Sequence, residues 1–349
     1  MTRERLALGT LLLAALLLPA VVRSPYVLHV AVLAGIYVVL TLSLNLVTGF
    51  CGQFSLGHAG FYGIGAYTAA LLAVSWGSPF GANLLAAAAT AGAAGFLIGL
   101  PTLRLGGIYL AMATLGFGEI IHLVLLNWLA LTRGPLGIPA IPGPAVLGVD
   151  LATPARQYYV VLALVVIATL VVSRLVNSSF GEAIQAIRED EIAAEALGVP
   201  ATRLKVVTFT LSAALAGVAG AFFAHYATFV SPGSFTLVES ILVLSLLVFG
   251  GMGSVEGSIA GAVVLTVAPE VFRFLAEYRM VIYGAILLGL ILFRPQGLLG
   301  GVSLGLTRRP RAATGRSPSN PTGRSPSNPT GRRPSEQSAS INSREARLA

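Results

Sequence analysis

The sequence is dominated by apolar runs that are long enough to cross a membrane. A perpendicular helix needs about 20 residues to span the hydrocarbon core, and several of the ten runs are shorter, so we predict eight to ten spans. Backbone groups in hydrocarbon must be hydrogen-bonded within the chain, and no run alternates in the manner of a barrel strand. The predicted fold class is therefore all-α, a polytopic transmembrane helical bundle of about ten helices. The runs are, roughly, Leu6 to Val22, Tyr26 to Val47, Ala59 to Trp76, Asn83 to Leu100, Ile108 to Leu131, Tyr158 to Leu175, Val206 to Tyr226, Val238 to Phe249, Ser258 to Leu275 and Met280 to Phe293.

The composition agrees with a membrane protein. Hydrophobic residues make up 55% of the chain and charged residues only 10%, whereas about a quarter of the residues in a soluble domain are charged. The first run follows Arg3 and Arg5 and so resembles a signal peptide. No A-x-A cleavage site follows it and Arg23 closes it, so we expect a retained helix.

The C-terminal tail differs from the rest of the chain. From Thr307 onward it carries nine Arg and two Glu, which is +7 of the formal net charge of +8, and it repeats the sequence TGRSPSNP. Pro, Ser, Gly and Arg offer no apolar surface to bury, so we expect residues 1–306 to form the transmembrane domain and residues 307–349 to be disordered. The tail could attract anionic lipid headgroups or be an expendable extension. The nearly neutral body argues against nucleic-acid binding.

The longest hydrophilic interruption runs from residue 176 to residue 205. We predict one helix within it, because Ser179 and Glu182 form a capping-box pattern, Gly198 suits a left-handed C-terminal position and Pro200 prevents continuation. An apolar face of this helix would contain Phe180, Ile184 and Ile187. The charged residues of this interruption and its edge are Arg174, Glu182, Arg188, Glu189, Asp190, Glu191, Glu195, Arg203 and Lys205.

The acids of this segment place like charges one helical turn apart, which weakens an isolated helix. Either the segment is a solvated loop helix, or it docks on a partner that supplies cations. If it is cytoplasmic, counting spans outward puts both termini in the cytoplasm and makes residues 132–157 the largest external loop. The short loops then follow the positive-inside rule once the segment and the tail are included. That arrangement places Arg3, Arg5, Arg104 and Arg294 inside and Arg23, Arg133, Arg156 and Arg279 outside.

A glycine-rich stretch follows the second apolar run. Each glycine weakens a helix by about 1 kcal/mol relative to alanine. Residues 49–57 read as a broken or re-entrant segment, of the kind that lines transport paths, and residues 60–65 as a small face for close helix contact. Within this stretch we favour a packed, hydrogen-bonded role for His58 over substrate contact. The glycines are Gly49, Gly52, Gly57, Gly60, Gly63 and Gly65, and they surround Gln53, Ser55 and His58.

Two further features interrupt the apolar pattern. Gly250, Gly251 and Gly253, followed by Glu256, predict a second break after the short eighth run. Glu119 lies in the middle of the fifth run, where an acid costs about 2.5 kcal/mol or more. It is either a functional site, with proton coupling as a corollary, or a structural partner of His122 or Arg104.

Several kinds of active site are absent from the sequence. No G-x-x-x-x-G-K-[ST] motif occurs, and Lys205 is the only lysine, so the chain does not hydrolyse nucleotides by a P-loop. The single cysteine, Cys51, excludes an internal disulfide and the usual zinc clusters. We expect a transport or channel subunit without enzymatic activity or a cofactor of its own. An ATP-driven engine would be another polypeptide.

Five stretches between Tyr26 and Leu299 together form a specific pattern. They are SLNLVTGFCGQFSLGHAGFYGIGAYTAALL, TLGFGEIIHLVLLNW with LTRGPLGI, FGEAIQAIREDEIAAEALGVPATRLKVVTFTLSAALAGVAGAFFAH, FVSPGSFTLVESILVLSLLVFGGMGSVEGSIAGA and RPQGLL. On these stretches the sequence resembles a known family, the LivM-type permease subunits of branched-chain amino-acid ABC importers.

The resemblance implies a bacterial inner-membrane permease that works by alternating access. It also implies two ATPase subunits that bind ATP and magnesium, a second permease of the LivH type and an extracytoplasmic substrate-binding protein. The coupling loop would bring Arg188, Glu189, Asp190, Glu191, Glu195 and Gly198 to an ATPase. The expected substrate-path residues are Asn45, Gln53, Ser55, His58, Tyr62, Glu119, Gly250 and Gly251.

Two departures from the family pattern affect this expectation. Glu195 lies three residues before Gly198, unlike the E-A-A-x-x-x-G form of other importers. The external stretch from Thr132 to Ile138 reads TRGPLGI where the family usually has TGGPNGI, so the substrate could be a branched-chain amino acid, another amino acid, an amide or urea. The alternative class is a self-sufficient proton- or ion-coupled carrier or channel that uses Glu119 and His122.

Overall fold

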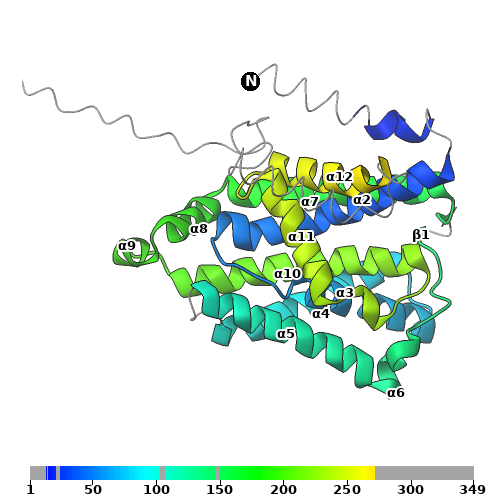
Figure 1. Cartoon of the computed structure of the whole chain (residues 1–349), viewed down its shortest axis with the longest axis horizontal. Helices are drawn as coiled ribbons and strands as arrows, with labels where there is room; N and C mark the ends of the chain where they lie inside the picture. Colours follow the sequence, from blue (N-terminus) through cyan, green and yellow to red (C-terminus); the bar gives the residue numbers. More distant parts are fainter. Residues whose placement is uncertain (1–12, 14, 21–23, 103–106, 147–148, 272–349) are drawn as a thin grey trace, which may run out of the picture. The chain divides into compact units, whose positions relative to one another are not determined.

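A computed structural model describes residues 13, 15–20, 24–102, 107–146 and 149–271. The described part is a bundle of helices, which confirms the all-α, multi-pass expectation (Figure 1). Its long helices are α2 (Pro25–Leu44), α3 (His58–Trp76), α4 (Phe80–Thr102), α5 (Gly107–Asn127), α7 (Pro154–Val176), α10 (Ala201–Ala227), α11 (Leu237–Gly250) and α12 (Val255–Val271). The shorter elements are the helices α6 (Leu129–Thr132), α8 (Ser179–Glu189) and α9 (Glu191–Ala196), the π-helix η1 (Asn45–Phe50), the 3₁₀ turns η2 (Gly134–Leu136) and η3 (Pro232–Ser234), and the antiparallel strands β1 (Ala145–Val146) and β2 (Val149–Asp150).

Seven stretches of the described residues are long and apolar enough to cross a membrane. They are Pro25–Phe50, His58–Trp76, Phe80–Pro101, Gly107–Asn127, Pro154–Val176, Ala201–Ala227 and Pro232–Gly250. Of the other expected spans, α12 has 17 described residues, and residues 15–20 of the first run are helical. The last run and the tail from residue 307 lie outside the described residues. The count of eight to ten spans stays a prediction.

Helix α10 is central and packs against α3, α4 and α2 (Figure 1). The close approach of α3 to α10 depends on small residues. A Cβ atom on Gly65 would lie 2.2 Å from the carbonyl oxygen of Gly217, and one on Gly220 would lie 2.1 Å from that of Tyr62. These distances confirm that the glycine-rich face of α3 serves close helix contact, as the sequence predicted.

The bundle has two distinct ends (Figure 1). Helices α8 and α9 lie at one end, and α6 and β1 lie at the other. At the second end, Ile138 and Val230 form an isolated β-bridge that ties the loop after α5 to the segment after α10. Trp76 and Trp128 close α3 and α5 at this end with 81% and 54% of their surface exposed. Exposed tryptophans at helix ends are typical of a membrane interface.

Candidate functional site

The first helix interruption separates α2 from α3. Helix α2 continues into the π-helix η1, the chain leaves helical structure from Cys51 to Gly57, and α3 begins at His58. Gly52 adopts a left-handed conformation here, with φ +74°. This confirms the broken segment predicted at residues 49–57. π-Helical turns inside transmembrane helices often mark functional positions.

The second interruption lies between α11 and α12. Gly251 and Gly253 have φ values of +116° and +80°, which glycine adopts without strain. The two interruptions meet at Asn45, which is fully buried. Its side-chain oxygen accepts a hydrogen bond from the Gly253 amide at 2.9 Å, and its nitrogen donates to the Ser254 carbonyl at 2.9 Å. Asn45 therefore joins the two broken regions.

The polar segment forms two helices where the sequence predicted one. The chain is extended at Asp190 (φ −156°, ψ 108°), between α8 and α9, and the Asp190 carboxylate accepts a hydrogen bond from the Ala193 amide at 3.0 Å. Asp190 is thus the N-cap of α9, a role that the acidic run concealed. The capping box at Ser179 was also wrong, because α8 already starts there and Ser178 precedes it. Gly198 has the expected left-handed conformation, with φ +87°.

Helix α8 is anchored in the bundle, and α9 is exposed. Ile184 and Ile187 are buried and Phe180 is half-buried, which confirms the predicted apolar face of α8. On α9 and just after it, Ile192 and Leu197 expose 82% and 86% of their surface. These are the two highest exposed fractions among the large apolar side chains of the described residues. They lie among charged residues, an arrangement that suits contact with another protein.

The acids of this segment do not all face outward. A carboxylate oxygen of Glu191 lies 2.5 Å from Nζ of Lys205, whose side chain is buried. Glu189 and Glu195 are exposed. Our sequence reasoning missed Lys205 as a functional residue, although a single lysine at the start of an apolar run was a usable signal, because a buried ammonium needs an ionic partner.

Arg188 also turns toward the bundle. Its Nη1 atom donates a hydrogen bond to the carbonyl of Gly49 in the first interruption. A Cβ atom on Gly253 would lie 2.6 Å from the same nitrogen. Arg188 therefore contacts both helix interruptions from α8. Its expected contact with an ATPase stays a prediction.

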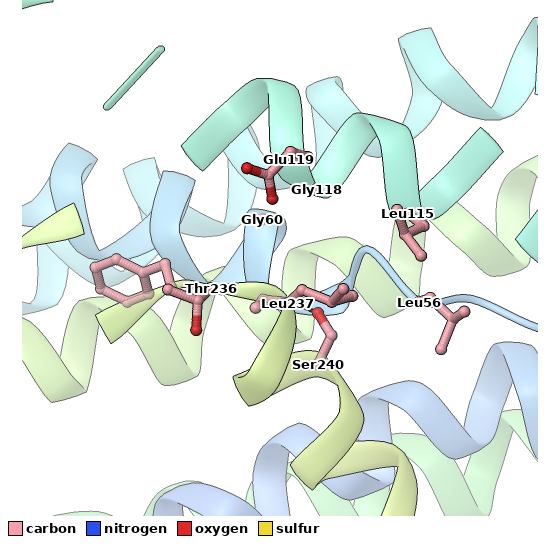
Figure 2. A pocket seen from close by; sticks show the side chains of 10 residues that line it. Leu56, Gly60, Leu115, Gly118, Glu119, Thr236, Leu237 and Ser240 are labelled. Carbon is pink, nitrogen blue, oxygen red and sulfur yellow. Dashed lines mark hydrogen bonds between the residues drawn. The ribbon is translucent and has the colours of Figure 1, made fainter. Parts of the chain in front are cut away.

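A pocket between α3, α5 and α11 contains Glu119 (Figure 2). Figure 2 shows Glu119 on one side of the pocket and Thr236, Leu237 and Ser240 on the other. The pocket is too narrow to hold a water molecule. It is lined by Leu56, Ala59, Gly60, Leu115, Gly118, Glu119, Phe235, Thr236, Leu237 and Ser240.

Glu119 is exposed halfway along α5. Within the described part of the chain it forms no ion pair, with His122 or otherwise, and Arg104 lies outside that part. Nδ1 of His122 is buried and has no hydrogen-bond partner there. The structure therefore does not show the structural partnership between Glu119 and His122.

The other expected path residues have different surroundings. His58 accepts or donates a hydrogen bond at 2.6 Å to Ser43, and Tyr62 packs against Phe223 and Phe235, so both are packed core residues. Gln53 and Ser55 differ, because their side-chain oxygens Oε1 and Oγ are buried without a hydrogen-bond partner among the described residues. Unpaired buried oxygens are costly and often have a functional explanation. Gly250 packs closely against Gly257, as in a close helix contact, and its expected place in the substrate path stays a prediction.

Comparison with known proteins identifies the family. Residues 26–291 match the family described as "Branched-chain amino acid transport system / permease component". The chain is 43% identical over 320 residues to the high-affinity branched-chain amino acid transport system permease protein LivM of Escherichia coli, covering 85% of this chain and 75% of the relative. It is 29% identical over 282 residues to BraD of Pseudomonas aeruginosa, covering 76% and 91%. It is 26% identical over 288 residues to LivH of Escherichia coli, covering 77% and 92%. No solved structure matches.

The chain belongs to the family of permease components of branched-chain amino acid transport systems, and it is a multi-pass membrane protein and a transport subunit rather than an enzyme.

Proposed function

We propose that this chain is a permease subunit of an ATP-binding-cassette importer in the bacterial inner membrane. A separate ATPase would drive it by alternating access, with α8 and α9 as the docking element. The observation that carries the proposal is the pair of exposed apolar residues Ile192 and Leu197 on a charged element that is anchored by buried Ile184 and Ile187. Such a pair suits contact with another protein, and because this chain has no P-loop, an ATPase would have to be a separate protein of that kind.

The proposed assembly contains several further components. A second, LivH-like permease pairs with this chain. Two ATPase subunits bind ATP and magnesium, with α8 and α9 as this chain's docking element, and a binding protein delivers substrate from outside. With α8 and α9 on the cytoplasmic side, as the positive-inside rule favours, both termini lie in the cytoplasm. Arg133 and Leu136 are exposed at the far end of the bundle from α8, where they would face the binding protein.

The proposed substrate path passes the Glu119 pocket. An ionised acid facing lipid at mid-span is costly, so this face of α5 should be covered by the second permease or by a water-filled path. The Glu119 carboxylate suits the ammonium group of an amino acid. Leu56, Leu115 and Leu237 supply apolar walls for the side chain of the substrate amino acid. We therefore favour branched-chain amino acids, the substrates in the relatives' names, over a related small polar solute.

One observation favours a second candidate function. Glu119 is exposed, and the unpartnered Nδ1 of His122 lies one helical turn away on α5. Such a pair could carry protons through a self-sufficient secondary carrier or channel. The charged docking element has no role in that candidate, so we rank it second.

Co-purification tests the docking element. The double variant I192D/L197D should lose its ATPase subunits while the permease keeps its elution profile in detergent, because a carboxylate cannot be buried in an apolar contact without an ionic partner. The matched control is L136D, which places the same charge on a residue that is 81% exposed at the opposite end. Full retention of the ATPase by I192D/L197D would refute the docking role.

A further inference from the structure

Arg188 occupies a junction of three elements that are far apart in the sequence. It lies in the last turn of α8, and its Nη1 atom donates to the carbonyl of Gly49, which is 139 residues away. Its stem lies against Gly52, where a Cβ atom would be 2.9 Å from the Arg188 Cγ atom. The same guanidinium lies against Gly253 in the second interruption.

The Gly49 carbonyl is available because a helix ends beside it. The last four carbonyls of a helix have no donor within the helix, and η1 ends at Phe50. The next free amide nearby, that of Gln53, donates to Val47 at 3.0 Å instead. A cation at a helix C-terminus satisfies such a carbonyl and interacts favourably with the helix dipole. Arg188 thus caps the span formed by α2 and η1.

The glycines of both interruptions leave room for this contact. Gly52 and Gly253 have positive φ values, and a side chain on either would press on Arg188. A Cβ atom on Gly49 would lie 1.6 Å from the side-chain oxygen of Asn45 and 2.6 Å from the Gly253 amide. Gly49, Gly52 and Gly253 therefore leave the space that the side chains of Asn45 and Arg188 occupy.

Two links then connect the docking element to the broken helices. Asn45 joins the interruptions to each other through Gly253 and Ser254. Arg188 joins both interruptions to α8. Helix α9, which carries exposed Ile192, follows α8 after the single extended residue Asp190. A displacement of α9 by a partner can therefore reach both interruptions through α8.

We propose that Arg188 is a positioning residue that transmits movement of the docked ATPase to the two helix interruptions, where it holds or releases the α8 end of the transport path. This inference rests on the proposed function, because it needs an ATPase bound at α8 and α9. In this proposal Arg188 acts through its contacts with the helix interruptions of the permease, and not through a contact with the ATPase.

The test uses the complete transporter, with both permeases and the ATPase subunits, reconstituted in lipid vesicles with its loaded binding protein. Three quantities are measured for wild type, R188Q, R188K and R203Q: co-purification of the ATPase, ATP hydrolysis, and substrate uptake per ATP hydrolysed. Arg203 is the matched control, because it is an exposed cation near the start of α10.

R188Q should retain its ATPase and its hydrolysis, but uptake per ATP should fall about five-fold or more, at the lower end of common coupling effects. R188K should fall less, because an ammonium group can still donate to the Gly49 carbonyl, and R203Q should match wild type. Wild-type uptake per ATP in R188Q would overturn the inference. So would a loss of ATPase from R188Q in proportion to the loss of transport, since Arg188 would then be a docking contact.

Hydrogen exchange covers the case in which R188Q does not fold. In wild type, trapping with ATP and vanadate should change amide exchange in residues 49–57 and 251–254, and in R188K this change should be smaller. Identical changes in the two proteins would refute the transmission role. If wild type itself does not bind the ATPase, the proposed function fails and the inference fails with it. If wild type transports substrate and R188Q has the same uptake per ATP, only the inference fails.

Discussion

The ammonium group of Lys205 lies 2.5 Å from the carboxylate of Glu191 and joins the start of α10 to α9. The lysine side chain is only 2% exposed and the glutamate side chain 43% exposed. Removing Glu191 would leave a buried cation unpaired, whereas removing both charges would not. The pair is therefore a structural link at the base of the docking element.

Removing one charge and then both tests this link. E191A should destabilise the permease by about 1–3 kcal/mol, less than a fully buried pair would lose, because water reaches the carboxylate. The double variant E191A/K205M should recover most of the loss. E195A, which removes an exposed acid from the same helix, is the control. Thermal unfolding in detergent measures all four proteins, and a double variant as unstable as E191A would show that the pair is not the cause.

The close contact between α3 and α10 predicts that adding one methyl group at Gly65 destabilises the fold. G65A places a Cβ atom 2.2 Å from the Gly217 carbonyl oxygen, and backbone cannot move aside as a flexible side chain would. Overpacking of this kind costs about 1–3 kcal/mol, so folded protein should decrease in detergent extracts. G81A is the control, because a Cβ atom there meets nothing within 4 Å. Equal yields and unfolding temperatures for the two variants would contradict the close approach.

Glu119 should affect transport without supporting the fold. E119Q should lower uptake about ten-fold or more, the effect of losing roughly 1.4 kcal/mol of interaction with a substrate cation. Its stability should not fall, because an exposed acid at mid-span is costly to keep in a membrane. Initial uptake rates and unfolding temperatures are measured beside E182Q, an exposed acid on α8. Normal uptake by E119Q would remove Glu119 from the path.

Cys51 should resist alkylation. It is buried just after η1, and burial raises the pKa of its thiol to about 12. Since the reactive form is the thiolate, native protein should show little labelling by N-ethylmaleimide at pH 7, and labelling should become complete on denaturation. Cysteine substituted for Leu197, which is 86% exposed, serves as the positive control. Rapid labelling of native Cys51 would contradict the packing of the first interruption.

Much of the architecture could be predicted from the sequence. The apolar runs predicted the helices, and the glycine clusters predicted both interruptions, because single residues of known conformational preference carry those signals. The apolar face of α8 followed in the same way from the spacing of Ile184 and Ile187. Local sequence patterns were sufficient to predict the features that depend on residues close together in the sequence.

The remaining features depend on distant partners or competing local signals. The contacts of Arg188 with Gly49 and of Asn45 with Gly253 join residues 139 and 208 positions apart, and no local pattern predicts such pairs. The single helix predicted from Ser179 to Gly198 was wrong, since Asp190 caps a second helix. The acidic run indicates only a charge at Asp190, whereas the Asp190 carboxylate accepts a hydrogen bond from the Ala193 amide and so starts a new helix.

The most direct test of the central claim is uptake of a labelled branched-chain amino acid by vesicles that contain this chain, its partner permease and the loaded binding protein, with and without the ATPase subunits. We predict that uptake requires both the ATPase and ATP and persists when a protonophore collapses the proton gradient. Uptake that continues without the ATPase and stops with the protonophore would contradict the account and favour a proton-coupled carrier that uses Glu119 and His122.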